Sequence, residues 1–131
     1  MRLFNILLSL AQKVGAIDDY VVETGTSGVW QYQKWNSGKM KAWIIEDLES
    51  STTPQALMGG MYGSVDVAIP QGFISAPRGV SSARLGTGAG FAFTIPHNTQ
   101  QIVIGILSNQ GISGEQIDAT IHSIILTGKW K

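Results

Sequence analysis

The segment VWQYQKWNSGKMKAWIIEDL, residues 29–48, decides the fold of this 131-residue chain. Two runs, Val29–Trp35 and Met40–Leu48, flank the short connection Asn36–Lys39. Bulky and polar side chains alternate along the first run, as in a β-strand whose successive side chains point to opposite faces. Asn and Gly accept positive φ angles at low cost, so a short connection that contains them favours a β-hairpin. The segment therefore predicts two antiparallel strands with aromatic side chains on both faces.

Similar short runs continue toward the carboxyl terminus, separated by clusters of Gly, Pro, Ser and Asn. Further strands are expected at Ser64–Ile69, Gly72–Ser75, Gly90–Ile95, Gln101–Leu107 and Ala119–Trp130. The stretch Ser50–Gly63 has no clear periodicity and is interpreted as a long loop. Frequent turn signals between short strands are typical of sandwiches and jelly rolls. We therefore expect residues 18–131 to form one mainly β, antiparallel, jelly-roll-like sandwich domain.

The first seventeen residues follow a helical pattern. Apolar side chains recur at spacings of four, three, four and three residues: Leu3, Leu7, Leu10, Val14 and Ile17. This is the a/d seam of a coiled coil, and Gly15 is suited to end the helix. A helix this short is marginal alone in water and must bury its stripe. We expect residues 1–17 to gather three copies into a homotrimer; packing of the helix on its own domain is the alternative.

The composition argues against several partners. Nine basic and nine acidic residues give zero net charge, so the chain lacks the basic footprint of a nucleic-acid-binding protein. No stretch approaches the roughly 20 apolar residues of a membrane-spanning helix. The chain has no cysteine, which excludes disulfides and thiolate metal sites. Neither nucleic acid nor membrane insertion is expected.

Motifs for cofactor binding are also missing. The glycine-rich segment Gly86–Gly90 precedes a strand-like run that ends at Pro96, whereas a phosphate-binding loop should lead into a helix. His97 lies in a Pro-His-Asn turn, and His122 lies in an apolar run typical of a core or interface histidine. Neither histidine has a partner at metal-ligand spacing. No cofactor or metal is therefore expected.

The carboxylates carry no catalytic signature. They cluster at Asp18–Asp19 and around Glu46, Asp47 and Glu49, next to predicted loops. A glycosidase needs two carboxylates that face each other across a cleft, and no motif here marks such a pair. We expect a protein without enzymatic activity, and a small glycan hydrolase that uses the region of Glu46 and Asp47 is the less favoured alternative.

Two segments of the chain resemble a known protein family. The run GTSGVWQYQKWNSG, residues 25–38, followed by Trp43, resembles the "SGxWxYxKWxSG…W" segment of phage and prophage tail or minor structural proteins. The ending TGKWK, residues 127–131, is similar to their Gly-basic-Trp terminus. The signature residues are Trp30, Tyr32, Lys34, Trp35, Trp43 and Trp130. This sequence departs from the family at residues 41–44, Lys-Ala-Trp-Ile, where relatives often carry small residues, a cysteine and a glycine.

The resemblance implies a domain at the end of a virion appendage or fibre, often trimeric, whose tip contacts the host surface. The expected function is thus that of a bacteriophage or prophage virion structural protein with a host-attachment role. Such a protein is made in the cytoplasm of the bacterial host and resides in the virion tail or fibre. Its expected partners are further copies of itself, other tail or fibre proteins, and a host-surface glycan or protein. A monomeric carbohydrate-binding module of a larger enzyme is the alternative.

Loop residues are the first candidates for contacts with a receptor, because polar loops on a rigid scaffold commonly carry recognition. The candidates are Tyr62, Arg78, Arg84, His97 and Asn98. The two arginines suit anionic sugars, although rim salt bridges are an equal interpretation. Trp35 and Trp43 are interpreted as packing anchors, whereas Trp30 and Tyr32 are candidates to stack on a sugar.

Overall fold

The computed structural model describes residues 19–52, 55–57, 60–86, 90–109 and 117–131. These residues form ten β-strands and no helix. The strands are β1 Val21–Ser27, β2 Trp30–Trp35, β3 Lys39–Ile44, β4 Leu48–Thr52, β5 Gln55–Leu57, β6 Gly60–Ala68, β7 Arg78–Leu85, β8 Gly90–Ile95, β9 Gln101–Ser108 and β10 Ile117–Lys129. The expected helix over residues 1–17 lies outside the described residues, and so does its stripe Leu3, Leu7, Leu10, Val14 and Ile17.

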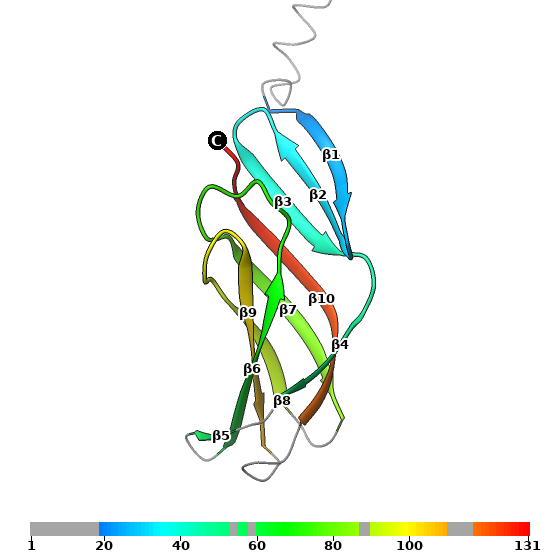
Figure 1. Ribbon diagram of the computed structural model, residues 1–131, viewed down its shortest axis with the longest axis vertical. Coiled ribbons are helices and arrows are strands. Elements are labelled where there is room, and N and C mark those ends of the chain that lie inside the picture. Colours follow the sequence, from blue (N-terminus) through cyan, green and yellow to red (C-terminus); the bar gives the residue numbers. More distant parts are fainter. Residues whose placement is uncertain (1–18, 53–54, 58–59, 87–89, 110–116) are drawn as a thin grey trace, which may run out of the picture.

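The strands form two antiparallel sheets (Figure 1). In the first, sheet A, the long strand β10 pairs with β3 through Ile125–Lys129 and with β4 through Ile117–Ile121. Strands β2 and β1 continue the sheet beyond β3, and β7 pairs with the other edge of β10. The second, sheet B, has the order β5-β6-β9-β8. The expected all-β, antiparallel sandwich class is confirmed.

The core lies between the two sheets and takes alternate residues from strands of both. Ile102, Ile104 and Ile106 of β9 are fully buried, as are Met40 and Ala42 of β3. Burial of one large aliphatic side chain contributes about 1.5–3 kcal/mol, so this layer is the main force that holds the sheets together. The remaining buried apolar residues are Trp30, Ile44, Ile69, Phe73, Ala119, Ile121, Ile124 and Leu126.

A β-bulge interrupts β10 at His122. Ile121 and Ile124 both point into the core although they are three residues apart, so the period of two is broken once. The register with β7 shifts between Ile121 and Ser123. A bulge inserts one extra residue and re-aims the side chains beside it. His122 and Ser123 are consequently both on the outer face of sheet A.

The predicted hairpin is confirmed as β2 and β3. Gly38 adopts a φ of 101°, and its N–H donates to the carbonyl oxygen of Trp35 at 3.0 Å. Only a residue that tolerates positive φ closes this turn without strain. The strands predicted at residues 64–69, 90–95, 101–107 and 119–130 are confirmed as β6, β8, β9 and β10, apart from a few terminal residues.

Two predicted strands are wrong. The run Met40–Leu48 is divided, because β3 ends at Ile44 and β4 starts at Leu48. The pairing with β10 ends at Trp43, whereas the N–H of Ile45 still donates to the carbonyl oxygen of Val29 at 2.9 Å and extends the pairing with β2 by one residue. The segment Gly72–Ser75 is a turn in which Gly72 has a φ of 126° and Phe73 inserts into the core.

The predicted loop Ser50–Gly63 is also wrong in its described part. It contains the end of β4, the short strand β5 and the start of β6. Strands β1 and β7 were not expected from the sequence. The inward positions of β7 include Gly79 and Ala83, and a Cβ added at Gly79 would lie 2.5 Å from Cδ2 of Leu126. Small residues let β7 approach β10 closely, but they give no hydrophobic alternation in the sequence.

Candidate binding surfaces on the two outer faces

The outer face of sheet A is organised in cross-strand rows. One row runs through Thr26, Gln31, Trp43, Ile125 and Val80, which are successive register partners on β1, β2, β3, β10 and β7. The half of the row from Trp43 to Val80 is apolar: Ile125 is 39% exposed and Val80, at the end of the row, is 66% exposed. Opposed side chains in such a row lie within contact distance of each other. A partly exposed tryptophan thus lies between an amide and an aliphatic side chain.

A shallow groove of about 460 Å³ opens beside Trp43. It lies where β10 has no partner on its β3 and β4 side, between the Ile125–Trp43 pair with β3 and the Ile121–Leu48 pair with β4; β7 still pairs with the other edge of β10 here. The groove therefore results from the departure of the chain after Ile44 and from the β-bulge in β10. We call it the tryptophan groove; it is lined by Gln33, Lys41, Trp43, Ile44, Ser123, Ile124 and Ile125.

Cationic side chains gather beyond one end of the tryptophan groove. Lys41 opposes Thr127, which in turn opposes Arg78, and the next pair along the strands is Lys39 with Lys129. Lys39 lies over the Trp35 ring, with Nζ 4.4 Å from the ring centroid. Among the described residues of these two rows there is no carboxylate. Asp19 offsets part of this charge, because Lys39 acts electrostatically on the Asp19 carboxyl and helps to lower its pKa. Lys41, Lys129 and Arg78 add the positive charge that would favour an anion.

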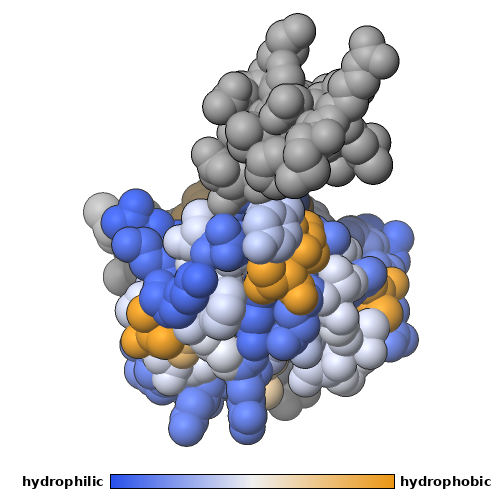
Figure 2. Space-filling view, turned by 90° about the horizontal axis from the view of Figure 1, so that it is seen from above, coloured by the Kyte–Doolittle hydropathy of each residue, from blue (hydrophilic) through white to orange (hydrophobic). Residues whose placement is uncertain are grey.

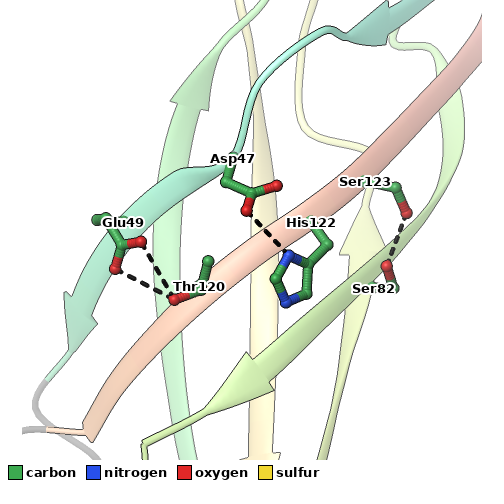
Figure 3. Close-up of polar contacts among 6 residues, drawn as sticks. All are labelled: Asp47, Glu49, Ser82, Thr120, His122 and Ser123. Atoms are coloured by element: carbon green, nitrogen blue, oxygen red, sulfur yellow. Dashed lines mark hydrogen bonds and ion pairs between the residues drawn. The ribbon is translucent and has the colours of Figure 1, made fainter.

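Polar cross-strand contacts occupy the other end of the face (Figure 3). Nδ1 of His122 lies 3.1 Å from Oδ2 of Asp47, and their side chains are 44% and 54% exposed. The hydroxyl of Thr120 donates to both carboxylate oxygens of Glu49 at 3.1 and 3.2 Å. These exposed contacts connect β4 and its preceding turn to β10. His122 is therefore not a core histidine, which was one of the two expected roles, and the interface role stays a prediction.

A hydroxyl pair accompanies these contacts on the opposite edge of β10. The Ser82 and Ser123 hydroxyl oxygens lie 2.7 Å apart across β7 and β10 (Figure 3).

The remaining carboxylates that the sequence singled out lie apart from these contacts. Glu46 is exposed next to Asp47, and Asp18 lies outside the described residues. Asp19 accepts a hydrogen bond from the Ser37 backbone N–H at 3.2 Å. Hydrogen bonds from Ser37 lower the pKa of the Asp19 carboxyl. Asp19 therefore stabilises the turn between β2 and β3.

The outer face of sheet B carries a cluster of aromatic side chains. Tyr62 of β6 stacks on Phe93 with ring centroids 6.3 Å apart, and Phe91 lies 6.1 Å from Phe93. The register places Leu107 between Tyr62 and Phe91. Phe91 is 57% exposed. We call this surface the aromatic face; its apolar residues are Tyr62, Phe91, Phe93, Ile95, Val103 and Leu107.

Phe93 lies flat on a glycine of the neighbouring strand. A Cβ added at Gly105 would come within 2.4 Å of the Phe93 ring. Asp66 is the one charged side chain among the described outward residues of β6, β8 and β9. The inner face of the same sheet carries Ile102, Ile104 and Ile106. The outer face of sheet B thus combines an apolar cluster with the polar residues Ser64, Asp66 and Gln101, whereas its inner face belongs to the core.

The end of the molecule where β1 begins is of mixed character. Viewed from that end, the visible surface is mostly hydrophilic, with hydrophobic side chains in separate spots (Figure 2). Tyr20, Val21 and Val22 lie at the start of β1 and are 54%, 40% and 44% exposed. The largest group of aromatic side chains on one outer face is therefore on the flank of sheet B.

The five predicted receptor residues do not come together. Tyr62 belongs to the aromatic face, whereas Arg78 and Arg84 lie at opposite ends of β7 on the outer face of sheet A. His97 and Asn98 lie in the β8–β9 turn. The Asn98 side-chain oxygen accepts hydrogen bonds from the backbone N–H groups of residues 100 and 101, both at 2.8 Å, so this residue holds its own turn.

Among the signature residues, Trp30 has a packing role. It is 3% exposed, and its indole N–H donates to the Ala68 carbonyl at 2.9 Å, which links β2 to the end of β6. Trp30 therefore cannot stack on a sugar, and this expectation is wrong. The indole N–H of Trp130 donates to the Trp35 carbonyl at 2.8 Å. Trp130 thus fastens the end of the chain to the hairpin.

Lys34 contacts the signature residues Tyr32 and Trp130 on the inward side of sheet A. Its Nζ lies 3.1 Å from Oε2 of Glu23, 5.7 Å from the Tyr32 ring centroid and 5.6 Å from that of Trp130. Hydrogen bonds from Lys34 and then Tyr32 lower the pKa of the Glu23 carboxyl. This cluster closes the end of the sandwich at which β1 begins, so Tyr32 also serves structure.

Trp43 is the functional candidate that sequence reasoning underestimated. It was interpreted as a packing anchor, but it lines the tryptophan groove on an outer face. The period of two already placed Gln31 and Gln33 on the face opposite to Trp30. What the sequence did not reveal was the register, which brings Trp43 next to Gln31 and Ile125.

The comparisons with known proteins find no match. No protein-family model, curated protein or solved structure is significantly similar to this chain. In the described part of the chain, no helix is long and apolar enough to cross a bilayer. Within the same ranges, no group of three His, Asp or Glu side chains is arranged to hold a metal ion. The resemblance to phage tail proteins stays a prediction, and the two outer faces are the basis for function.

Proposed function

We propose that the chain is a non-enzymatic structural and attachment module of a bacteriophage or prophage tail or fibre, which works as a homotrimer. The observation that carries the proposal is the aromatic face. Phe91 alone, at 57% exposure, presents a large apolar surface to water on a sheet whose other face already forms the core. Exposed apolar patches of this kind on folded domains commonly mark protein interfaces.

The proposed occupant of the aromatic face is another copy of the same chain. The face contains one charged residue, Asp66, among its described members, which suits burial against a similar apolar surface. Three copies that turn this face toward a common axis would bury it. The stripe of the expected N-terminal helix, Leu3 to Ile17, would extend the same axis. A jelly-roll-like sandwich with an N-terminal trimerisation helix is part of this proposal.

Assembly leaves the outer face of sheet A exposed for contacts with the host or with other tail proteins. In this arrangement the protein resides in the virion and contacts neighbouring tail or fibre proteins. Its polar and charged rows match the wet, reversible character of attachment surfaces. Solution mass tests the proposal directly. Three chains of 14.1 kDa give about 42 kDa by light scattering at micromolar concentration, and a mass of 14.1 kDa at all concentrations up to 100 μM would contradict it.

A second candidate function is supported by the tryptophan groove. A monomeric carbohydrate-binding module needs a partly exposed aromatic ring beside hydrogen-bonding side chains, and Trp43 with Gln33 and Ser123 offers such a set. Glycan binding by a protein that remains monomeric would favour this second function over the trimeric module.

A further inference from the structure

We propose that the tryptophan groove binds an acidic sugar unit of a surface polysaccharide, with the sugar ring on Trp43 and its anionic group toward Lys41. The inference deepens the proposed attachment function, because it assigns the place and the chemical class of the ligand. It begins from the position of the groove. The groove lies on the face that a trimer built through sheet B leaves exposed.

The groove provides both parts of sugar recognition. Trp43 is a partly exposed aromatic ring of the kind that suits the C–H face of a pyranose, and Nζ of Lys41 lies over this ring, 5.8 Å from its centroid. A sugar stacked on Trp43 would therefore contact Lys41 directly or displace it from the ring. Gln33 offers an amide donor and acceptor from one side, and Ser123 offers a hydroxyl from the other. The volume of about 460 Å³ is in the range of small-molecule sites, about 300–1,000 Å³, and accommodates one or two sugar units.

The charge around the groove favours an acidic ligand. Lys41 lines the groove itself, and the row that continues from it contains Thr127 and Arg78. Lys129 follows on the same face, two residues from Thr127. Asp47 and Glu49 lie toward the opposite end, where His122 and Thr120 contact them. A carboxylate or phosphate on the sugar would therefore be oriented toward Lys41.

The floor of the groove is fixed by the fold. Ile44 and Ile124 are buried core residues, at 9% and 0% exposure, so the backbone beneath the ligand is anchored to the core. The bulge at His122 holds Ser123 on the outer face, where its hydroxyl contacts Ser82. A site with a fixed floor loses little entropy when it binds a ligand.

The test measures binding of defined oligosaccharides to the full chain by isothermal titration calorimetry. The acidic probes are trigalacturonate, sialyllactose and a hyaluronan tetrasaccharide. Methyl-esterified trigalacturonate provides the ring without the charge, and poly(glycerol phosphate) provides the charge without the ring. We expect at least one acidic oligosaccharide to bind more tightly than both controls, with an affinity that falls as salt is raised.

Three variants assign the binding to the groove. Trp43→Ala should weaken binding of the acidic probe at least about tenfold, because the stacking surface is removed. Lys41→Gln should weaken it about three- to tenfold and leave the methyl ester unaffected. Trp35→Ala is the matched control, since Trp35 is a partly exposed tryptophan on the same face outside the groove. The affinity of the Trp35→Ala variant for the acidic probe should stay within about twofold of the wild-type value.

The outcomes separate this inference from the proposed function. Failure of all acidic probes to bind below about 10 mM, or equal binding by the Trp43→Ala variant with an unchanged melting temperature, would overturn the groove assignment. Equal affinity for trigalacturonate and its methyl ester would overturn the role of Lys41. A trimer that binds no probe contradicts only the inference, whereas a monomer that binds acidic sugars contradicts only the assembly.

Discussion

The two sheets share one core but present opposite outer faces. On sheet A, charged, amide and hydroxyl side chains surround a short apolar row of Trp43, Ile125 and Val80 beside the tryptophan groove. On sheet B, Tyr62, Phe91 and Phe93 form a continuous aromatic cluster with one neighbouring charge, Asp66, among the described outward residues. Both sheets contribute buried apolar residues to the core between them. We therefore propose that the two sheets differ in what covers their outer faces: water and a ligand on sheet A, and another copy of the chain on sheet B.

The largest effect should come from a charge placed on the aromatic face. Phe91→Lys would bury an ammonium group where a phenyl ring is expected to meet another copy, and we expect dissociation to the 14.1 kDa chain with an affinity loss of at least about 100-fold. Val80→Lys is the matched control, because Val80 is even more exposed, at 66%, but lies on sheet A. Sedimentation equilibrium measures the solution mass of both variants. Equal masses of the two variants would refute the distinction between the faces.

A smaller effect is expected from filling the space under Phe93. A Cβ in Gly105→Ala would meet the Phe93 ring at 2.4 Å, so the ring must move away from the sheet. We expect a loss of about 1–3 kcal/mol in the free energy of unfolding, measured by denaturant titration, together with weaker association. Gly86→Ala is the control, since its added Cβ would be 3.4 Å from the nearest atom. If both variants have the same free energy of unfolding, the packing of Phe93 does not require a glycine at position 105.

The smallest effect concerns an ion pair of sheet A. The pKa of Glu23 is lowered in the folded chain, chiefly by Lys34, so the pair stabilises the fold above the unfolded-state pKa. That contribution is lost as the pH falls through the lowered folded-state pKa. Glu23→Gln should therefore lower the melting temperature slightly at pH 7, and the difference should become smaller at about pH 2, because the carboxyl takes up a proton as the pH falls. A difference of the same size at both pH values would show that the charge is irrelevant.

Much of the fold was predictable because it depends on local periodicity. The hairpin at residues 29–48 and four later strands follow from alternation and from turn residues. Strand β7 was missed because its inward positions hold Gly79, Ser81 and Ala83, which give no apolar signal. The split between β3 and β4 was missed because Ile44 and Ile45 read as one apolar run, although only Ile44 is buried.

The candidate sites were less predictable because they depend on register. Trp30 and Trp43 both belong to the hairpin, but one is buried in the core and the other lines a groove. The choice between these positions is made by the pairing of β3 with β10 and by the bulge at His122. The aromatic face joins residues of three strands that are distant in the sequence. Neither arrangement is encoded in a local motif.

Hydroxyl-radical footprinting of the full chain tests the difference between the outer faces most directly, because it reports both in one experiment. At concentrations that favour assembly, we expect Phe91 and Tyr62 to be protected from oxidation and to become reactive on dilution. Trp43 should react equally at every concentration, since it lies on the face that stays open. Oxidation of Phe91 that matches its 57% exposure in the single chain at all concentrations would contradict the account.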